Sequence, residues 1–213
     1  ATHDVDLSSL LSKLLRHKAA ELGTAISPQG WVAMPDAILE INGKRLRAIV
    51  GNADKLSSHT YTAFDVYEVV AKDDKQRFEL SEDRTLIRAA QGHTMKGVAE
   101  TLGKPLTLDA APLVAVHGSF VKNLQPILSG GLSRMGRHFV HLAKGLLGED
   151  DVISGMRRNT DLFIWVNVRD AVRDGLRFFE SSNGVILGDG RDGDGIIPPK
   201  YFSVVIELRG GLL

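Results

Sequence analysis

The sequence contains no cysteine and no apolar run long enough to cross a bilayer. The absence of cysteine excludes disulfide bonds, thiolate nucleophiles and cysteine-ligated zinc, and it fits a reducing compartment without requiring one. Residues 1–6 are polar and acidic, and they lack the basic and apolar regions of a secretory signal. We therefore expect a soluble, intracellular protein, in the cytoplasm or, in a eukaryote, also in the nucleus, with no membrane partner.

The chain also lacks net charge, because 26 basic residues balance 26 acidic ones. A nucleic-acid-binding protein usually carries excess positive charge on at least one face. Contact with nucleic acid must therefore come from local basic clusters. Three such clusters exist, at residues 13–18, at residues 134–144 and at Arg157-Arg158. The simpler interpretation of any one cluster is a solvated surface.

Several phosphate- and metal-binding motifs are absent. The sequence has neither a GxxxxGK[ST] loop nor a GxGxxG segment between a strand and a helix. The Asp/Gly-rich segment 188–194 is interpreted as a surface turn, and it lacks the downstream glutamate of a calcium loop. His138 and His141 are three residues apart, which in a strand places them on opposite faces. We expect no metal.

The first 95 residues are predicted to form a helical lobe with a two-stranded hairpin. The first predicted helix covers 5–22 and stops at Gly23, with one apolar stripe formed by Leu7, Leu10, Leu11, Leu14 and Leu22. Arg16 projects away from that stripe and His17 lies at its edge. Pro35 begins a second helix to Ile41, and Thr60 or Thr62 caps a third to Ala71. Residues 76–81 and 85–90 form the hairpin. Helices followed by such a hairpin are typical of a winged-helix lobe, one class of nucleic-acid reader.

The remainder is predicted to be a linker over 96–112 and a β-rich lobe over 113–213. Short apolar runs alternate with glycine turns in this lobe, and they predict strands at 113–116, 139–142, 162–168, 185–187 and 202–208. One helix, Val121–Leu128, interrupts them and ends at Gly130-Gly131. The fold class predicted for the whole chain is α+β.

The residues left for chemistry are arginines and histidines next to glycines. They are Arg16, His17, Arg88, His117-Gly118-Ser119, Arg134, Arg137, His141 and Arg157. A guanidinium offers two parallel donors to phosphate oxygens and stays charged at physiological pH. Each arginine alone is most simply an exposed surface residue. Together they favour a two-lobed protein that handles phosphate, with RNA as one possible ligand.

Many short motifs resemble those of the RNA 2′-phosphotransferase family, KptA type, in the family's order over about residues 11–208. In the first lobe these are residues 11–17 (LSKLLRH), 29–32 (QGWV), 75–78 (KQRF) and 87–93 (IRAAQGH). In the second they are 116–119 (VHGS), 131–137 (GLSRMGR), 140–143 (VHLA), 153–157 (ISGMR), 182–187 (SNGVIL) and 199–202 (PKYF). The family commonly has threonine where this chain has Ser119 and serine where it has Thr94, so both positions keep a hydroxyl group. Arg137-His138-Phe139 departs from its pattern, which leaves the role of His138 open.

The resemblance implies a winged-helix RNA-binding lobe followed by an ADP-ribosyltransferase-like lobe that binds NAD⁺ and consumes it. The implied reaction has two steps. The RNA 2′-phosphate attacks C1 of the nicotinamide ribose, and the ribose 2-hydroxyl of the attached ADP-ribose then attacks the phosphorus. The products are nicotinamide, RNA with a free 2′-hydroxyl and ADP-ribose 1″,2″-cyclic phosphate. The implied substrate is RNA carrying an internal 2′-phosphate, with spliced tRNA as the expected one.

The resemblance also assigns the site residues. The essential Arg-His pair, the central arginine and the late arginine of the family match Arg16, His17, Arg88 and Arg157. The residues implied for NAD⁺ binding are His117, Gly118, Ser119, Gly131, Leu132, Arg137, His141 and Ser154. We expect a monomer. Two alternatives stay open, an ADP-ribosyltransferase that caps phosphorylated RNA ends or modifies protein, and a non-catalytic RNA-binding module.

Overall fold

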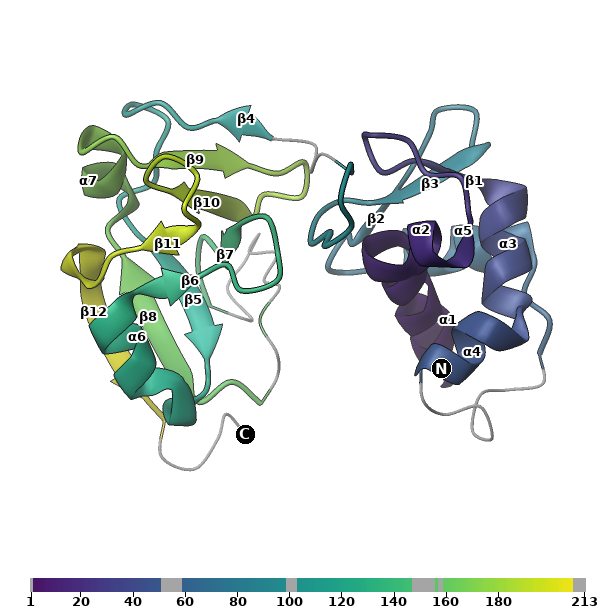
Figure 1. Cartoon of the computed structure of the whole chain (residues 1–213), viewed down its shortest axis with the longest axis horizontal. Helices are drawn as coiled ribbons and strands as arrows, with labels where there is room; N and C mark the ends of the chain where they lie inside the picture. Colours follow the sequence, from purple (N-terminus) through teal and green to yellow (C-terminus); the bar gives the residue numbers. More distant parts are fainter. Residues whose placement is uncertain (1, 51–58, 99–102, 147–155, 157–158, 209–213) are drawn as a thin grey trace. The chain divides into compact units, whose positions relative to one another are not determined.

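A computed structural model describes residues 2–50, 59–98, 103–146, 156 and 159–208. The chain divides into two units, Ala1–Thr101 and Leu102–Leu213, and each has its own hydrophobic core (Figure 1). Each unit combines helices with antiparallel sheets, so the α+β class expected from the sequence is confirmed at that level. No helix among the described residues is long and apolar enough to span a membrane.

The first unit begins with one helical segment whose leucines are buried. It consists of α1 (Thr2–Lys13), a π-helical turn η1 (Leu14–Lys18) and α2 (Ala19–Leu22). It starts earlier than the predicted position at Val5 and ends where predicted, because Gly23 adopts a φ of 83° that a glycine tolerates at a helix end. The π-helical turn was not predicted.

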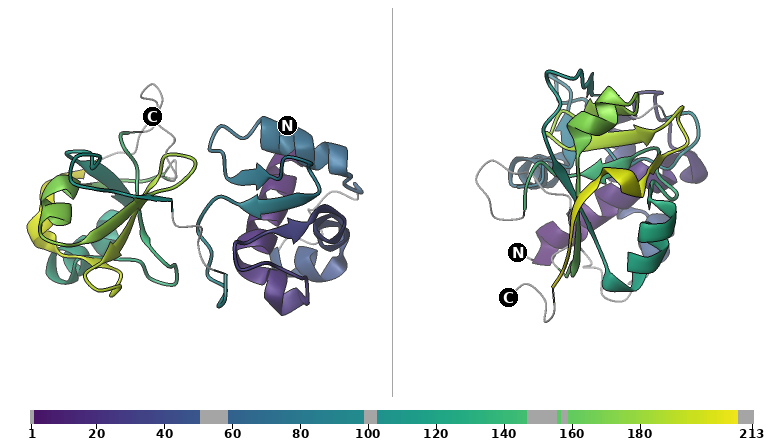
Figure 2. Two further views of the ribbon diagram at one scale, coloured as in Figure 1. Left: turned by 90° about the horizontal axis from the view of Figure 1, so that it is seen from above. Right: turned by 90° about the vertical axis from the view of Figure 1, so that its left-hand side faces the viewer.

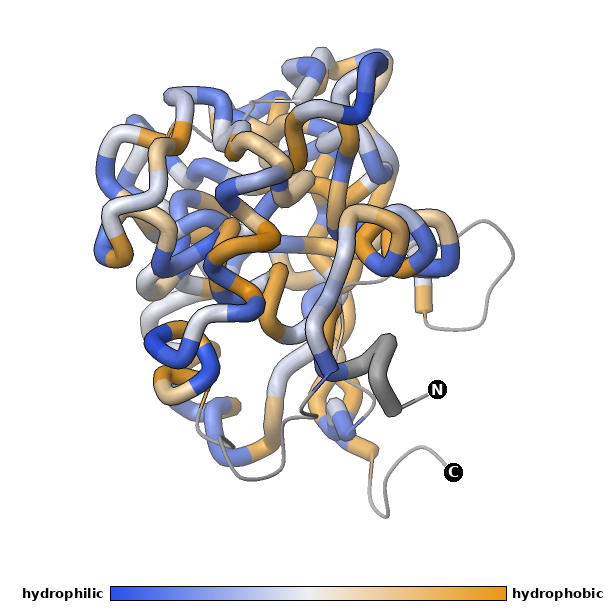
Figure 3. Tube along the Cα trace, turned by 90° about the vertical axis from the view of Figure 1, so that its right-hand side faces the viewer, coloured by the Kyte–Doolittle hydropathy of each residue, from blue (hydrophilic) through white to orange (hydrophobic). Residues whose placement is uncertain are grey.

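Three further helices pack against this segment. They are α3 (Met34–Asn42), α4 (Lys44–Val50) and α5 (Ala63–Ala71). Pro35 lies in the first turn of α3, as predicted. Of the two predicted caps of α5, Thr60 and Thr62, it is Thr62 that caps the helix, through a reciprocal pair of hydrogen bonds with Asp65 that was not predicted. Helix α4 was not predicted. Figure 3 shows hydrophobic and hydrophilic residues interspersed along the trace, as expected where helices bury one face.

A three-stranded sheet completes the first unit. The predicted hairpin is confirmed as β2 (Phe78–Leu80) and β3 (Leu86–Ala89). A short strand that the sequence did not reveal, β1 (Val32–Ala33), pairs with the other edge of β3 and gives the order β1-β3-β2. The helices and the sheet enclose one core that includes Leu10, Leu14, Ile41, Leu46, Val66, Phe78 and Ile87.

The second unit is built on two larger sheets and a two-stranded one. The first has the order β12-β8-β5, formed by Phe202–Glu207, Leu162–Val166 and Ala115–Ser119. The second has the order β4-β9-β10-β7, formed by Lys104–Pro105, Arg177–Glu180, Ile186–Gly190 and Val140–Leu142. Strands β6 (Leu132–Ser133) and β11 (Ile196–Ile197) pair with each other. Strand β12 is the outer edge of its sheet, as the further views in Figure 2 also show.

Strand and helix limits in the second unit differ from the prediction in several places. Strand β8 stops at Val166, because the Asn167 side chain accepts a hydrogen bond from Asp170 N and starts helix α7 (Val168–Arg173). The predicted single helix is a 3-10 turn, η2 (Val121–Asn123), followed by α6 (Leu124–Gly130). A second 3-10 turn, η3 (Pro199–Tyr201), precedes β12.

Two segments interpreted as irregular contribute to these sheets. Residues 188–190, interpreted as part of a surface turn, are the end of β10, and Gly188 is buried there. Lys104–Pro105 lies within the segment expected to be the linker over 96–112, yet it forms β4 and pairs with β9. Leu106 and Ala111 enter the core of the second unit.

Candidate functional site

Arg16 and His17 lie in the π-helical turn of the first unit. Such turns carry one more residue than an α-helical turn, and they occur frequently at functional sites. Thr94 N donates to Arg16 O at 2.9 Å, and His17 Nδ1 lies 3.0 Å from Thr94 Oγ1. The predicted Arg-His pair is therefore joined to Thr94, the residue after the 87–93 motif, by both a backbone and a side-chain hydrogen bond.

Two glycines with positive φ lie at this point, and at Gly30 the close packing also leaves no room for a side chain. Gly92 has a φ of +86°, and a Cβ placed there would lie 3.5 Å from Cδ and 3.6 Å from Nε of Arg16. Gly30 has a φ of +82°, and its Cβ would lie 2.9 Å from Nε2 of the fully buried His93. The Arg16 side chain therefore lies against the backbone of Gly92, and the 29–32 motif packs directly on the 87–93 motif.

Arg88 lies on β3 with its guanidinium between a carboxylate and an indole. Its Nε and Nη2 donate to Oε2 of Glu79 at 2.9 and 2.5 Å, and Cζ stands 4.4 Å from the centroid of the Trp31 ring. Only 15% of the side chain is exposed. The described contacts of Arg88 are thus with Glu79 and Trp31, whereas Arg16 and His17 are joined to Thr94.

Sequence reasoning did not select Glu79, Trp31 or Thr94 as site residues. Glu79 pairs with Arg88 directly across the hairpin. Opposite charges at paired positions of a predicted hairpin could have indicated this contact from the sequence. Thr94 was noticed only as a departure from the family pattern. Its contact with His17 joins residues 77 positions apart, which no local pattern reveals.

In the second unit, His117 and His141 lie on neighbouring strands. His117 is on β5 and His141 on β7, and an isolated bridge between Val116 and Ala143 joins the two strands. Each imidazole donates through Nδ1 to a backbone carbonyl, His117 to His141 O at 2.9 Å and His141 to Phe139 O at 3.0 Å. In a neutral ring this leaves Nε2 as a hydrogen-bond acceptor.

The imidazole of His117 is kept neutral by its surroundings. Burial lowers the pKa of His117 below the ordinary 6.5, and the positive charge of Arg137 acts in the same direction. The hydrogen bond to the His141 carbonyl raises the pKa of His117; this effect is smaller than that of burial and larger than that of Arg137. The Nε2 atom of His117 is therefore an acceptor at neutral pH.

We expect this buried histidine to destabilise the second unit in mild acid. Because the pKa is lower in the folded state than in the unfolded state, the unfolded state takes up the proton first as the pH falls below about 6.5. The free energy of unfolding of the second unit then decreases, and this group contributes at most about 1.4 kcal/mol of that loss for each pH unit. Trp165 fluorescence in a Trp31→Phe background should follow unfolding of the second unit at pH 7.5 and 5.5. A His117→Asn variant should show a smaller loss, and an equal loss would contradict this origin.

The remaining residues assigned to NAD⁺ binding fall into two groups. Ser119 Oγ accepts from Asn123 Nδ2 at 3.3 Å on β5, and Arg137 is exposed in the turn before β7. By contrast, a Cβ at Gly118 would lie 2.7 Å from Cγ and Sδ of Met156, and one at Gly131 would lie 2.6 Å from Ile197 O. Leu132 is buried in the core and pairs with Ile197. Gly118, Gly131 and Leu132 therefore pack closely in this fold, and their assignment to NAD⁺ binding stays a prediction.

Arg157, Ser154 and His138 are the other residues that the sequence singles out. Arg157 and Ser154, expected to act in catalysis and in NAD⁺ binding, lie outside the described residues. His138 is not in a strand, contrary to the premise used for it, and lies in the bend before β7. Its Nε2 atom is buried without a hydrogen bond to the described residues. Within the described part of the chain, no group of three or more His, Asp or Glu side chains is placed to hold a metal ion.

Comparisons with known proteins agree with the motif order. Residues 2–190 match the model of a family described as RNA 2′-phosphotransferase, Tpt1/KptA family. The tRNA 2′-phosphotransferase 1 of Bos taurus is 42% identical over 97% of this chain and 76% of its own length. The tRNA 2′-phosphotransferase of Saccharomyces cerevisiae is 31% identical over 98% and 86%, and a probable RNA 2′-phosphotransferase of Trichormus variabilis is 32% identical over 94% and 96%.

Proposed function

The chain belongs to the RNA 2′-phosphotransferase, Tpt1/KptA family, and we propose from this premise that it transfers an internal RNA 2′-phosphate to ADP-ribose supplied by NAD⁺. The observation that carries the proposal is the junction of the Arg16-His17 turn with residues 92–94. It gathers a guanidinium, an imidazole and a hydroxyl, which together suit a phosphate dianion. The substrate proposed is spliced tRNA with a 2′-phosphate, because the similar proteins from Bos taurus and yeast are tRNA 2′-phosphotransferases.

The proposed reaction balances without a metal or an added water. In the first step a phosphate oxygen bonds to C1 of the nicotinamide ribose, and the bond to nicotinamide breaks. In the second step the neighbouring ribose 2-hydroxyl loses its proton and bonds to phosphorus, and the bond from phosphorus to the RNA 2′-oxygen breaks. That oxygen takes up a proton and becomes the free 2′-hydroxyl. The other product is ADP-ribose 1″,2″-cyclic phosphate.

In the first unit we assign the phosphate contacts to Arg16 and His17. The side chain of Arg16 lies beside Gly92, and its guanidinium suits a paired interaction with two phosphate oxygens. His17 is oriented by Thr94, so it can donate to the phosphate or pass a proton to the departing 2′-oxygen. Arg88 is assigned to the same phosphate from its match to the family, and Glu79 and Trp31 then fix its guanidinium in place.

In the second unit we assign the NAD⁺ contacts to side chains whose polar atoms suit the ribose hydroxyls and the pyrophosphate of NAD⁺. The acceptor atoms of His117 and His141 suit ribose hydroxyls, which donate hydrogen bonds. Ser119 adds a hydroxyl, and the exposed guanidinium of Arg137 suits a pyrophosphate. Ser154 and Arg157 enter the proposal through their match to the family motifs. An ADP-ribosyltransferase-like fold for this unit and a winged-helix fold for the first are parts of the same proposal.

The decisive experiment follows one 2′-phosphorylated oligonucleotide with and without NAD⁺. We expect phosphate removal only with NAD⁺, no effect of a metal chelator, and one cyclic phosphate product for each 2′-phosphate removed. Full activity without NAD⁺, or loss of activity on chelation, would contradict the proposal. ADP-ribosylated RNA ends or protein without any cyclic phosphate would instead identify an ADP-ribosyltransferase.

A further inference from the structure

A hollow of about 300 Å³ lies beside His17 in the first unit. Its polar side comes from the first helical segment and its apolar side from the end of α4, with the lining residues Ser9, Ser12, Lys13, His17, Ile49 and Val50. This volume is at the lower end of the range for small-molecule sites. A hollow with hydroxyls and a cation facing two aliphatic side chains matches the two halves of a nucleotide, a charged sugar-phosphate and a flat apolar base.

Lys13 gives the hollow a positive charge, and none of the six lining residues is acidic. It is half-buried and makes no ion pair or hydrogen bond with the described residues. The next lysine on the same segment behaves differently, because Lys18 forms an ion pair with Glu21. A lysine held at a concave surface without a carboxylate partner is suited to bind an anion from solution.

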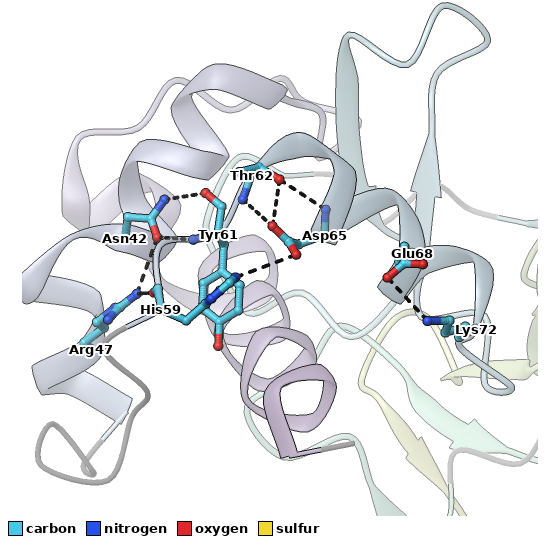
Figure 4. Close-up of polar contacts among 8 residues, drawn as sticks. All are labelled: Asn42, Arg47, His59, Tyr61, Thr62, Asp65, Glu68 and Lys72. Atoms are coloured by element: carbon cyan, nitrogen blue, oxygen red, sulfur yellow. Dashed lines mark hydrogen bonds and ion pairs between the residues drawn. The ribbon is translucent and has the colours of Figure 1, made fainter.

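The apolar side of the hollow is held in place by contacts that fix α4. Arg47, in the middle of that helix, donates to Ile41 O at 3.0 Å, and its guanidinium lies 5.8 Å from the Tyr61 ring centroid. It also donates to His59 O at 2.9 Å (Figure 4). Asn42 donates to Tyr61 O and accepts from Tyr61 N, each at 2.8 Å. These contacts bind α4 to the chain before α5, so Ile49 and Val50 present a positioned surface.

We propose that this hollow binds the nucleotide next to the 2′-phosphorylated one, with Lys13 on the phosphodiester between them. The inference rests on the proposed function, because it takes His17 as the 2′-phosphate contact. Lys13 precedes His17 by one helical turn, about 6 Å along the axis. This offset leaves room for Lys13 to contact the next phosphate of the RNA chain while His17 contacts the 2′-phosphate. Ser9 and Ser12 face the ribose, and Ile49 and Val50 face the base.

The test compares two substrates that differ only in the neighbouring nucleotide. One is a 2′-phosphorylated mononucleotide, and the other is a short oligonucleotide with an internal 2′-phosphate. Wild-type enzyme should prefer the oligonucleotide in kcat/KM. Lys13→Ala should reduce that preference about tenfold through the KM of the oligonucleotide, and Lys13→Arg should restore most of it. The slope of log affinity for the oligonucleotide against log salt should decrease by about 0.7, the value for one lost phosphate contact on a single strand.

Lys44→Ala is the matched control, because Lys44 is an exposed lysine of α4 that does not line the hollow. It should leave both the preference and the salt slope unchanged. If Lys13→Ala changes both substrates equally, or if Lys44→Ala has the same effect, the inference is overturned while the proposed function stands. If wild-type enzyme transfers the 2′-phosphate from neither substrate with NAD⁺ present, the proposed function itself fails.

Discussion

Replacing Arg157 by alanine is expected to make RNA joined to ADP-ribose through its 2′-phosphate accumulate. In the first proposed step the phosphate is the nucleophile, so added positive charge on its oxygens helps little. In the second step phosphorus is attacked and negative charge grows on those oxygens, which a guanidinium stabilises. Loss of a donor that acts in the transition state commonly costs about 10²–10³ in rate. We expect that loss in the second step, with a smaller effect on the first.

The measurement is a single-turnover time course resolved on a denaturing gel, where the joined species migrates more slowly than substrate or product. Arg158→Ala is the matched control, because it removes the same charge from the next position. Arg157→Lys should recover only part of the rate, since an ammonium lacks the planar pair of donors. Wild-type turnover in Arg157→Ala, or a block before any joined species forms, would show that this role is wrong.

Local sequence signals predicted much of the first unit. Thr62 capping α5, Pro35 opening α3 and Gly23 ending the first helical segment each depend on the residue itself and its near neighbours. The hairpin was predictable for the same reason, because its polar turn separates two strands that pair with each other. Such features need no information about the rest of the chain.

The features that sequence reasoning missed depend on distant partners. Strand β1 has two residues and exists through pairing with β3, more than 50 positions later, so no alternation marks it. The π-helical turn carries no local signature either, and residues of that turn bond to Thr94. In the second unit, β4 lies in a polar segment with a proline and is a strand only through its pairing with β9.

For the candidate site, too, the sequence predicted some features and not others. Arginines next to glycines predicted phosphate chemistry, but spacing alone did not bring residue 16 near residue 92. The order of the motifs, through resemblance to a family, supplied that grouping. The structure then adds the contacts that the motif order does not contain, namely Thr94 on His17, and Glu79 with Trp31 on Arg88.

Replacing His17 by alanine is expected to reduce the second step by about 10²–10³, the range that general acid-base and charge-stabilising groups commonly contribute. The Nδ1 atom of His17 interacts with Thr94 Oγ1 at 3.0 Å, which assigns the substrate contact to the other ring nitrogen, Nε2. A glutamine amide reaches about the position of Nε2, whereas an asparagine amide reaches that of Nδ1. We therefore expect His17→Gln to retain more activity than His17→Asn, with the amount of joined species measured as for Arg157.

Thr94 provides the test that separates this role from a structural one. If its hydroxyl orients the imidazole, Thr94→Val should lower kcat about tenfold and leave KM nearly unchanged, because the backbone bond from Thr94 N to Arg16 O is kept. Thr94→Ser keeps the hydroxyl and should restore the rate. The joined species should accumulate with valine and not with serine, because the orientation of His17 matters most when the 2′-oxygen departs. Equal activity of the valine and serine variants would mean that the hydroxyl does not position His17. Equal activity of the glutamine and asparagine variants at residue 17 would mean that Nε2 is not the atom that acts.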